Sequence, residues 1–323
     1  MSERRFDPTS GTWVTFADHR QDRTFLPAAA ECPLCPSLPG GAATEVPRPS
    51  FEIAVFDNRF PALAPTAAVA DEDDGLYRRG AGRGRCEVVV YTDQHDGTLA
   101  TLGRDRVRLL VDVWADRYDV LSGEPGVQYV MPFENKGAVV GVTLDHPHGQ
   151  VYAYPDVPPR IASRLTAARA HHDRTGRCVH CDVVASEAET STRVVLRTDD
   201  VVAFVPYATR FPYEVQVVPV AHLRRLTDAS LAVRDQLADV LHRLMAGYDR
   251  LFDRPLPYVL AVQQRPTGPG DWDDISHLHI EITPPHRTAE KLKYLAGSEL
   301  AAGAFITDVL PEAAAAMLRG VVA

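Results

Sequence analysis

The sequence predicts an α+β protein made of two tandem halves of the same plan, each with a mainly antiparallel sheet and one long helix. Two observations support this prediction. Cysteines and histidines recur in the same order in both halves, and each half has one long amphipathic helix followed by a strand-like segment and a His-x-His motif. Strands that lie before and after a single helix favour an antiparallel sheet over alternating β–α units. We place the boundary between the halves between residues 173 and 174.

The two long helices are predicted from apolar residues spaced three and four positions apart, which form one face of a helix. These residues are Val107, Leu110, Trp114, Tyr118 and Leu121 in the first half, and Leu237, Leu241, Leu244, Tyr248 and Leu251 in the second. A further helix is expected over residues 159–172. Strand-like runs bounded by Pro, Gly, Asp and Asn are expected at residues 52–56, 87–91, 127–133, 193–196, 201–205, 214–218 and 258–263.

Composition and charge narrow the functional classes. The chain has 323 residues, 45% hydrophobic and 24% charged, which is ordinary for a globular protein. A net charge of −9 argues against a general nucleic-acid binder, because such a protein needs a basic surface. The first residues contain no sustained apolar run, and no segment approaches the roughly 20 apolar residues of a membrane span. We therefore expect a cytoplasmic protein without membrane contact.

Four of the five cysteines form two Cys-x-x-Cys pairs, and each pair is followed by two histidines. The first set is Cys32, Cys35, His95 and His146, and the second is Cys178, Cys181, His222 and His277. Two cysteines with two histidines suit a tetrahedral zinc ion. A thioredoxin-like redox role for the first pair is the competing interpretation, but its segment is rich in proline and lacks a strand-to-helix context. We expect a zinc ion in each half, and we interpret His180 as an ordinary surface histidine.

The segment from residue 133 to residue 150 carries the strongest chemical signal, His146-Pro147-His148-Gly149-Gln150. Alternate residues of a strand point to the same side, so His146 and His148 should share a face. A neutral imidazole is a competent nucleophile towards phosphorus when its other nitrogen is held as N–H, for instance by a carbonyl near His146. Gly149 leaves room for a phosphate, and Gln150 can donate to a phosphate oxygen. Two structural histidines on a core strand are the alternative, which the flanking residues disfavour.

This segment resembles the galactose-1-phosphate uridylyltransferase family, a branch of the histidine-triad superfamily. The likeness runs over nearly the whole chain and includes Arg20, Arg23, the Phe56-Asp57-Asn58 segment, Lys293 and Glu299. It implies a two-step exchange of UMP between UDP-glucose and galactose 1-phosphate through a covalent uridylyl-His148. It also implies a homodimer, and no organic cofactor is expected.

The resemblance also assigns binding roles by position. The α-phosphate region would be held by Asn135, Gly141, Thr143 and Gln150, and the nucleotide by Arg20, Arg23, Phe56 and Asn58. Lys293 and Glu299 would bind the hexose phosphate across a subunit boundary. The first metal set would be a structural zinc site.

Two features of the sequence depart from the family's pattern. Family members often carry an iron-type second site of one glutamate and three histidines, but Gln263 and Gln264 occupy the place of one histidine and Ala162 or Arg164 that of the glutamate. We therefore expect a second zinc there. Ser298 and Phe305 stand where the family has polar sugar contacts, so the acceptor sugar is less well defined than the reaction.

Three alternative functions stay open at this point. An ADP-sugar phosphorylase or adenylyltransferase would use the same nucleophile with another base. A histidine-triad nucleotide hydrolase would use water as acceptor, although Gln150 replaces the third histidine that such hydrolases carry. A non-catalytic zinc-stabilised binding protein is the most distant alternative, because a scaffold has no need of Gly149 and Gln150 beside a metal ligand.

Overall fold

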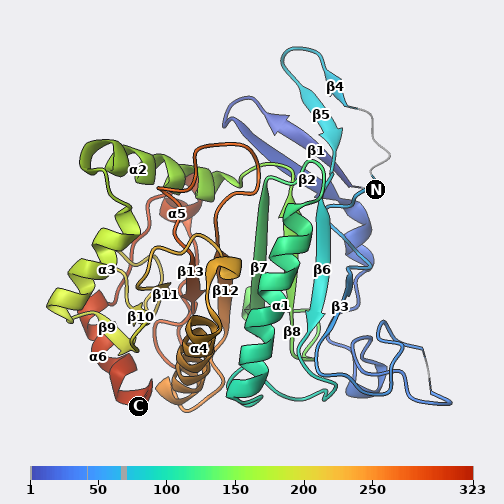
Figure 1. Cartoon of the computed structure of the whole chain (residues 1–323). Helices are drawn as coiled ribbons and strands as arrows, with labels where there is room; N and C mark the ends of the chain where they lie inside the picture. The colour runs from blue at the N-terminus through green and yellow to red at the C-terminus, as the bar shows by residue number, and fades with distance from the viewer. Residues whose placement is uncertain (1, 42, 67–70, 323) are drawn as a thin grey trace.

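The computed structural model describes residues 2–41, 43–66 and 71–322, and its centre is a nine-stranded antiparallel sheet (Figure 1). The strand order is β3-β6-β8-β7-β12-β13-β11-β10-β9. The strands are β3 (Ala54–Asp57), β6 (Arg85–Val90), β7 (Tyr129–Lys136), β8 (His148–Tyr154), β9 (Val194–Arg197), β10 (Val201–Phe204), β11 (Val215–Pro219), β12 (Tyr258–Gln263) and β13 (His279–Thr283). Seven of them overlap the strand-like runs expected from the sequence, and β8 and β13 begin at the second histidines of the two His-x-His motifs.

The sheet is internally symmetric. From its edge to the middle of the sheet, the first half reads β3-β6-β8-β7. The second half reads β10-β11-β13-β12, with β9 added outside β10, and the halves meet where Lys136 of β7 pairs with Tyr258 of β12. Each half also has one long helix before its last two strands. The predicted α+β class and duplicated plan are confirmed, and the two halves share one continuous sheet. The boundary at residues 173 and 174 falls in the last turn of α2 (Pro159–Thr175) and stays a prediction.

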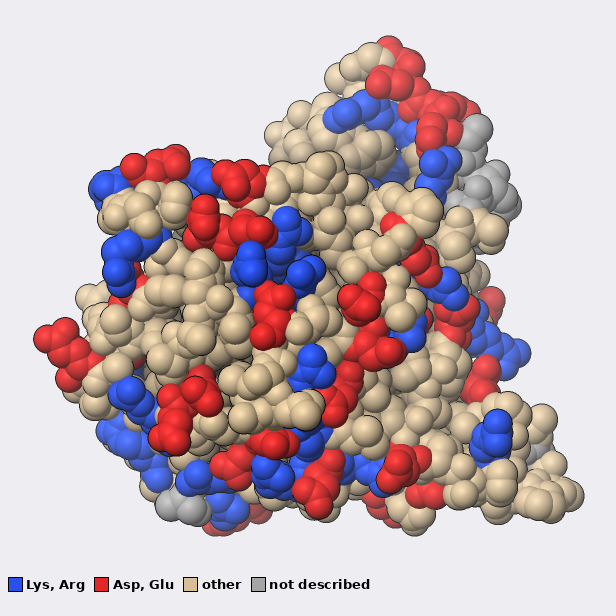
Figure 2. Space-filling model, in the orientation of Figure 1, with Lys and Arg blue, Asp and Glu red and all other residues tan. Residues whose placement is uncertain are grey.

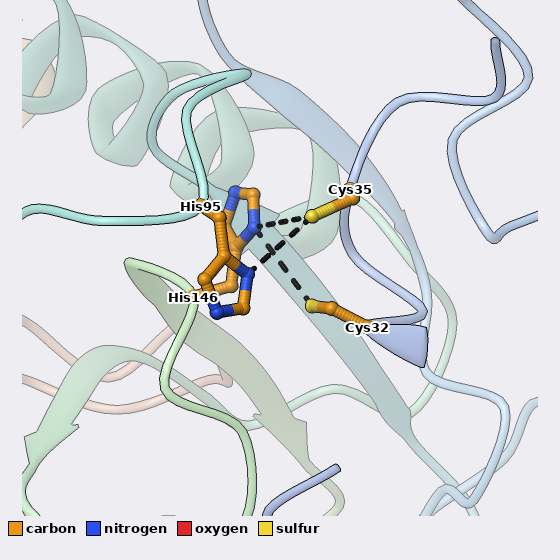
Figure 3. Close-up of side chains that lie close together, drawn as sticks. All are labelled: Cys32, Cys35, His95 and His146. Carbon is orange, nitrogen blue, oxygen red and sulfur yellow. Dashed lines mark hydrogen bonds between the residues drawn. The ribbon is translucent and has the colours of Figure 1, made fainter. Parts of the chain in front are cut away.

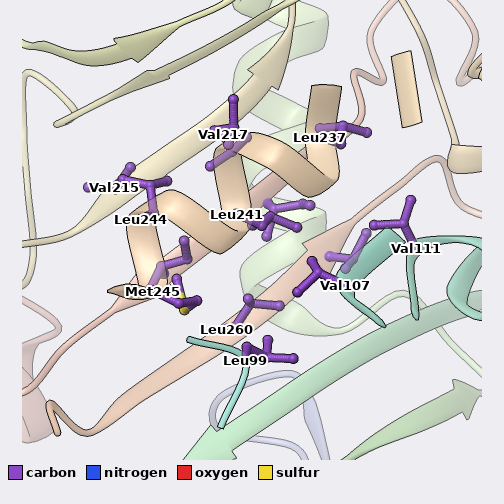
Figure 4. Packing of buried hydrophobic residues seen from close by; sticks show 14 of the residues in the cluster. Leu99, Val107, Val111, Val215, Val217, Leu237, Leu241, Leu244, Met245 and Leu260 are labelled. Carbon is purple, nitrogen blue, oxygen red and sulfur yellow. The ribbon is translucent and has the colours of Figure 1, made fainter. Parts of the chain in front are cut away.

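One face of the sheet is covered by α1 (Arg104–Ser122) and α4 (Leu231–Leu251). The predicted helical faces are buried in one core that spans both halves. Figure 4 shows side chains of α4, among them Leu241 and Leu244, packed close to strand residues such as Val217. The Ser230 side chain accepts a hydrogen bond from the backbone N–H of Val233, which satisfies one of the free donors at the start of α4.

The opposite face differs between the halves. In the second half, Val202 and Phe204 of β10 pack against Val184 of α3 (Val179–Thr190), which follows α2 in the chain. In the first half, Val88 and Val90 of β6 pack against a loop segment that carries Cys32 and Leu34, and no helix belongs to this cluster of the described residues. Because side chains alternate along a strand, this face is also the one that His148 presents.

Smaller elements surround this sheet. A second sheet of β1 (Ser2–Asp7), β2 (Thr12–Ala17), β4 (Glu72–Asp73) and β5 (Arg78–Ala81) projects beside it (Figure 1). Short helices complete the described chain: η1 (Asp18–Asp22), η2 (Ala29–Glu31), η3 (Ala138–Val140), η4 (Leu226–Asp228), α5 (Gly297–Ala302) and α6 (Pro311–Val322). Acidic and basic side chains are interspersed on the face shown in Figure 2. Within the described ranges, no helix has the length and apolar character that a membrane crossing requires.

Candidate active site and metal centres

One pocket on the open face of the first half collects all nine residues predicted for the nucleophile, the nucleotide and its phosphate. Its lining includes Arg20, Arg23, Phe56, Asn58, Asn135, Gly141, Thr143, His148 and Gln150. These residues come from η1 and the segment after it, from the end of β3, and from β7, β8 and the loop between them. The backbone N–H of Leu26 donates to the carbonyl of Thr143 at 2.8 Å, which holds the arginine segment against that loop.

The His148 ring is held in a single orientation. Its Nδ1 lies 2.7 Å from the carbonyl oxygen of His146, so Nδ1 carries the proton and donates, and Nε2 keeps its lone pair. Burial lowers the pKa of His148, and the hydrogen bond to His146 offsets only part of this effect. The ring is therefore neutral at neutral pH. Its Nε2 is a nucleophile next to a pocket, as the sequence predicts.

The amide of Gln150 is oriented by Asn58. The Asn58 Nδ2 donates to Gln150 Oε1 at 3.2 Å, and the Asn58 Oδ1 accepts from the backbone N–H of Phe60 at 2.8 Å. The chain of hydrogen bonds leaves the Gln150 amide nitrogen to donate into the pocket. Asn58 thus acts through Gln150 as well as lining the pocket itself.

Two further side chains, which were not predicted from the sequence, complete the lining of the pocket. Tyr152 lies two residues after Gln150 on the same face of β8, accepts a hydrogen bond from Arg20 at 3.1 Å and packs edge-on against Phe133 at 5.0 Å. Strand alternation alone could have identified Tyr152. Arg59 adds a third lining guanidinium against the single carboxylate of Glu45. A concave site with this charge balance favours an anionic ligand.

Gly149 lines the pocket with its backbone, but the space left by its missing Cβ lies behind the strand. A Cβ on Gly149 would point away from the pocket, to 2.1 Å from the Tyr91 hydroxyl and 2.7 Å from the carbonyl oxygen of Phe133. The glycine is required because Tyr91 fills the space behind the strand. The reason is again alternation, since His148 and Gln150 take the pocket side.

Next to the pocket, the first predicted metal set comes together (Figure 3). Ligand atoms of Cys32, Cys35, His95 and His146 all lie within 4.8 Å of one another. His146 Nε2 lies 2.8 Å from the carbonyl of Thr92, so this nitrogen donates and Nδ1 faces the two sulfurs. A metal-ligating histidine typically donates its other ring N–H to a carbonyl in this way, which fixes the orientation of the ring.

The chemistry of this group fits zinc. Burial, together with the neighbouring Cys32, raises the pKa of Cys35 to about 11. Two adjacent thiols, one buried and one half-buried, do not ionise together unless a cation compensates their charge, and a divalent ion supplies that compensation. Two sulfur and two nitrogen donors are a common structural zinc set. His146 belongs both to this group and to the segment that orients His148.

The second predicted set is only partly assembled. Ligand atoms of Cys178, Cys181 and His277 lie within 4.8 Å of one another, but His222 is outside the group. His222 Nε2 instead lies 2.8 Å from the carbonyl of Ser276, and its ring stacks on His277 with centroids 5.2 Å apart. The expectation of four assembled ligands is thus corrected to three.

His180 was also misinterpreted as a surface residue. Its ring stacks on His279 with a centroid distance of 4.4 Å, and its Nδ1 is buried. Burial, with the neighbouring histidines, lowers the pKa of His180 well below its usual value. The reason is α3, which carries His180 against the sheet and which the sequence analysis did not predict.

Lys293 and Glu299 do not line the His148 pocket of their own chain. Lys293 Nζ donates to Glu299 Oε1 at 2.8 Å and also to the carbonyl of Ile306, and both side chains are 6% exposed. The Lys293 ammonium is the main cause that lowers the pKa of Glu299 to about 2. Within one chain the predicted sugar-phosphate residues therefore bind each other.

Comparisons with known proteins agree with this geometry. The N-terminal domain of galactose-1-phosphate uridyl transferase matches residues 1–158, and the C-terminal domain of the same family matches residues 165–323. The galactose-1-phosphate uridylyltransferase of Thermotoga maritima is 38% identical, covering 99% of this chain and 98% of its own length. That of Streptomyces lividans is 39% identical, covering 90% and 79%.

Solved structures give the same result. A structure of a uridylyltransferase is 30% identical, with a TM-score of 0.86 and coverage of 99% of this chain and 98% of that chain. An ADP-glucose phosphorylase from Arabidopsis thaliana with bound ADP-glucose shares the fold at 23% identity, a TM-score of 0.76 and 99% coverage of both chains. Together with the full-length family matches, these results show that the chain belongs to the galactose-1-phosphate uridylyltransferase family.

Proposed function

We propose that the protein exchanges a uridylyl group between UDP-glucose and galactose 1-phosphate through a covalent intermediate on His148. The observation that carries the proposal is the hydrogen bond from His148 Nδ1 to the carbonyl of His146, which leaves Nε2 free beside an open pocket. Membership of the uridylyltransferase family supports the choice of reaction.

In the first step, His148 Nε2 attacks the α-phosphorus of UDP-glucose. The bond from this phosphorus to the bridging oxygen breaks, and its electron pair leaves with glucose 1-phosphate. In the second step, a phosphate oxygen of galactose 1-phosphate attacks the same phosphorus, and the bond to Nε2 breaks to restore the neutral imidazole. One nucleophile serves both steps because both leaving groups are sugar phosphates.

The other pocket residues hold and neutralise the phosphates. Gln150, Asn135 and Thr143 can donate hydrogen bonds to the non-bridging oxygens, on which charge shifts in the transition state. Arg20 and Arg23 add positive charge on the nucleotide side, with Arg20 held by Tyr152. Positioning and charge stabilisation account for most of the catalysis of phosphoryl-type transfer.

Zinc at Cys32, Cys35, His95 and His146 would act as a structural cross-link between the cysteine loop and the catalytic segment. We propose a second zinc at Cys178, Cys181 and His277, supported by the proximity of their ligand atoms. Metal analysis of the purified protein should find two zinc ions per chain. One ion per chain would remove the second site, and none would remove both.

We also propose that Lys293 and Glu299 bind the hexose phosphate of a partner chain in a homodimer. Their position outside their own pocket supports this arrangement. Light scattering should give twice the chain mass. Mixing His148→Ala chains with Lys293→Ala chains should restore part of the activity, because one hybrid pocket then has both residues intact. A monomer with full activity would contradict the proposal.

The reaction is tested by mixing the protein with UDP-glucose and labelled galactose 1-phosphate and measuring labelled UDP-galactose. Parallel samples with ADP-glucose and inorganic phosphate, and with water as the sole acceptor, test the phosphorylase and hydrolase alternatives. We expect transfer in the first sample only, abolished by His148→Ala and retained by His279→Ala. A folded, metal-loaded His148→Ala protein that transfers at the normal rate would contradict the mechanism.

A further inference from the structure

A cluster of three buried polar side chains lies behind the catalytic strand, on the face opposite to the pocket. Tyr258 of β12 donates its hydroxyl to Glu134 Oε1 at 3.1 Å. The Tyr91 hydroxyl and Glu134 Oε2 are both buried without a hydrogen-bond partner among the described residues, and each group shifts the pKa of the other. Glu134 is 5% exposed, and both tyrosines are fully buried. Polar groups so deep in an apolar core cost folding free energy unless they are hydrogen-bonded.

Tyr91 contacts the backbone on both sides of the nucleophile. Its N–H donates to the carbonyl of Pro147 at 3.0 Å, one residue before His148. Its hydroxyl lies against Gly149, where a Cβ would come within 2.1 Å of it, one residue after His148. The ring of Tyr91 thus limits how far β8 can shift away from the pocket.

Glu134 connects this contact to the pocket and to the other half of the molecule. It lies on β7 between Phe133 and Asn135, both of which line the pocket. The partner that binds its carboxyl, Tyr258, belongs to the second half. Lys136 bonds Asp249 at 2.7 Å and lies over the Tyr258 ring at 5.4 Å, which extends the cluster to the end of α4.

We propose that Glu134 is a positioning residue for the nucleotidyl transfer. As the buried polar neighbour of the Tyr91 hydroxyl, it keeps that hydroxyl against Gly149, while Tyr258 anchors the Glu134 carboxyl from the second half. This inference rests on the proposed function. It gives the second half a role in catalysis although its own histidine pair lines only a small cavity of about 40 Å³, against about 200 Å³ at His148.

The protonation of Glu134 is consistent with this role. Burial raises the pKa of Glu134 to about 7, opposed by Tyr258, Lys136 and Tyr91. A carboxyl that carries a proton in the core can donate to one hydroxyl while it accepts from the other. Replacing it with an amide keeps the shape and removes the acid.

The test measures single-turnover labelling of His148 by UDP-glucose in Glu134→Gln, Tyr91→Phe and Tyr258→Phe. We expect labelling to slow by about tenfold to a hundredfold in Tyr91→Phe and Glu134→Gln, because small misplacements of a nucleophile have effects of this size. Tyr258→Phe should show a smaller effect in the same direction. UMP affinity and zinc content should stay within about twofold of the original protein, since the pocket lining is unchanged.

Tyr129→Phe is the matched control. Tyr129 is an equally buried tyrosine of β7 whose hydroxyl donates to Gln263 at 2.8 Å, and it has no contact with Gly149. Its loss should leave the labelling rate unchanged. Hydrogen exchange of a peptide over residues 146–151 should be faster in Tyr91→Phe and Glu134→Gln than in this control.

Two results would overturn the inference. One is labelling in Glu134→Gln and Tyr91→Phe at the original rate. The other is slowing that Tyr129→Phe reproduces in proportion to its loss of thermal stability, which would make the cluster structural only. If the unmodified protein forms no adduct at all, the proposed function itself fails, so the two failures are distinguishable.

Discussion

The two halves of the molecule hold the same histidine pair in nearly the same local geometry. In the first half, Nδ1 of His148 lies 2.7 Å from the carbonyl of His146, and in the second, Nδ1 of His279 lies 2.8 Å from that of His277. In both halves the first histidine of the pair faces a pair of cysteines. Both halves therefore hold the second histidine of the pair by the same backbone hydrogen bond.

The surroundings of the two rings differ. Two residues after His148 stands Gln150, a neutral donor, whereas two residues after His279 stands Glu281, an anion that would repel a phosphate. Arg164 of α2 pairs with Glu281, His180 of α3 stacks on His279, and the His279 Nε2 is buried without a hydrogen-bond partner among the described residues. Access and neighbouring donors, rather than the motif alone, separate an active half from a structural one.

The largest effect within this comparison is expected when Gln150 is replaced by the residue of the other half. Gln150→Glu should reduce transfer by about a thousandfold, because it removes a donor to the phosphate and adds a negative charge. Steady-state kinetics on a protein of unchanged melting temperature would measure this. Gln150→Met separates the lost donor from the added charge and should cost less. Equal activity of Gln150→Glu and the original protein would break the comparison.

The next effect distinguishes the two metal groups. Cys32→Ser should lose one zinc and reduce transfer by about tenfold to a hundredfold, since the metal fixes the segment that orients His148. Cys178→Ser should lose one zinc and some thermal stability, but its transfer rate below the melting temperature should stay within about threefold. Metal analysis, thermal melting and kinetics would be run side by side. A greater loss of transfer in Cys178→Ser than in Cys32→Ser would reverse the assignment of roles.

The smallest effect concerns acid stability of the second half. Burial opposes ionisation of Glu281, but the Arg164 guanidinium more than offsets this and lowers the pKa of Glu281 from 4.5 to about 2. A lowered pKa stabilises the fold above pH 4.5, and that stability is lost as the pH falls towards 2. Glu281→Gln should therefore cost about 3 kcal/mol at neutral pH and less near pH 3. Urea unfolding at both pH values would measure the difference.

A double replacement serves as the control for this pair. Arg164→Met combined with Glu281→Gln removes both charges, so it should recover part of the stability that the single replacement loses. A Glu281→Gln protein as stable as the original at pH 7 would show that the pair does not stabilise the second half.

Much of the fold and of the site could be predicted from the sequence because the signals are local. The spacing of Val107, Leu110 and Trp114 predicts the buried face of α1, and the structure buries it. His146 and His148 share one segment, and the backbone of that segment fixes the His148 ring. The order of cysteines and histidines predicts the duplication without any knowledge of how the halves are joined.

The remaining features depend on contacts between distant segments. Nothing near Gly149 indicates that Tyr91, 58 residues earlier, fills the space behind it. Similarly, the burial of His180 depends on α3 packing against β10, and the Lys293–Glu299 pair depends on how the C-terminal segment folds back. The continuous sheet, made by β7 and β12, also has no local sequence signal.

The most direct test of the account is to incubate the protein with UDP-glucose alone, digest it and map the modified peptide by mass spectrometry. The account predicts one uridylyl group on His148 and none on His279, with equal amounts of glucose 1-phosphate released. Modification of His279, or full transfer activity without any adduct on His148, would contradict it.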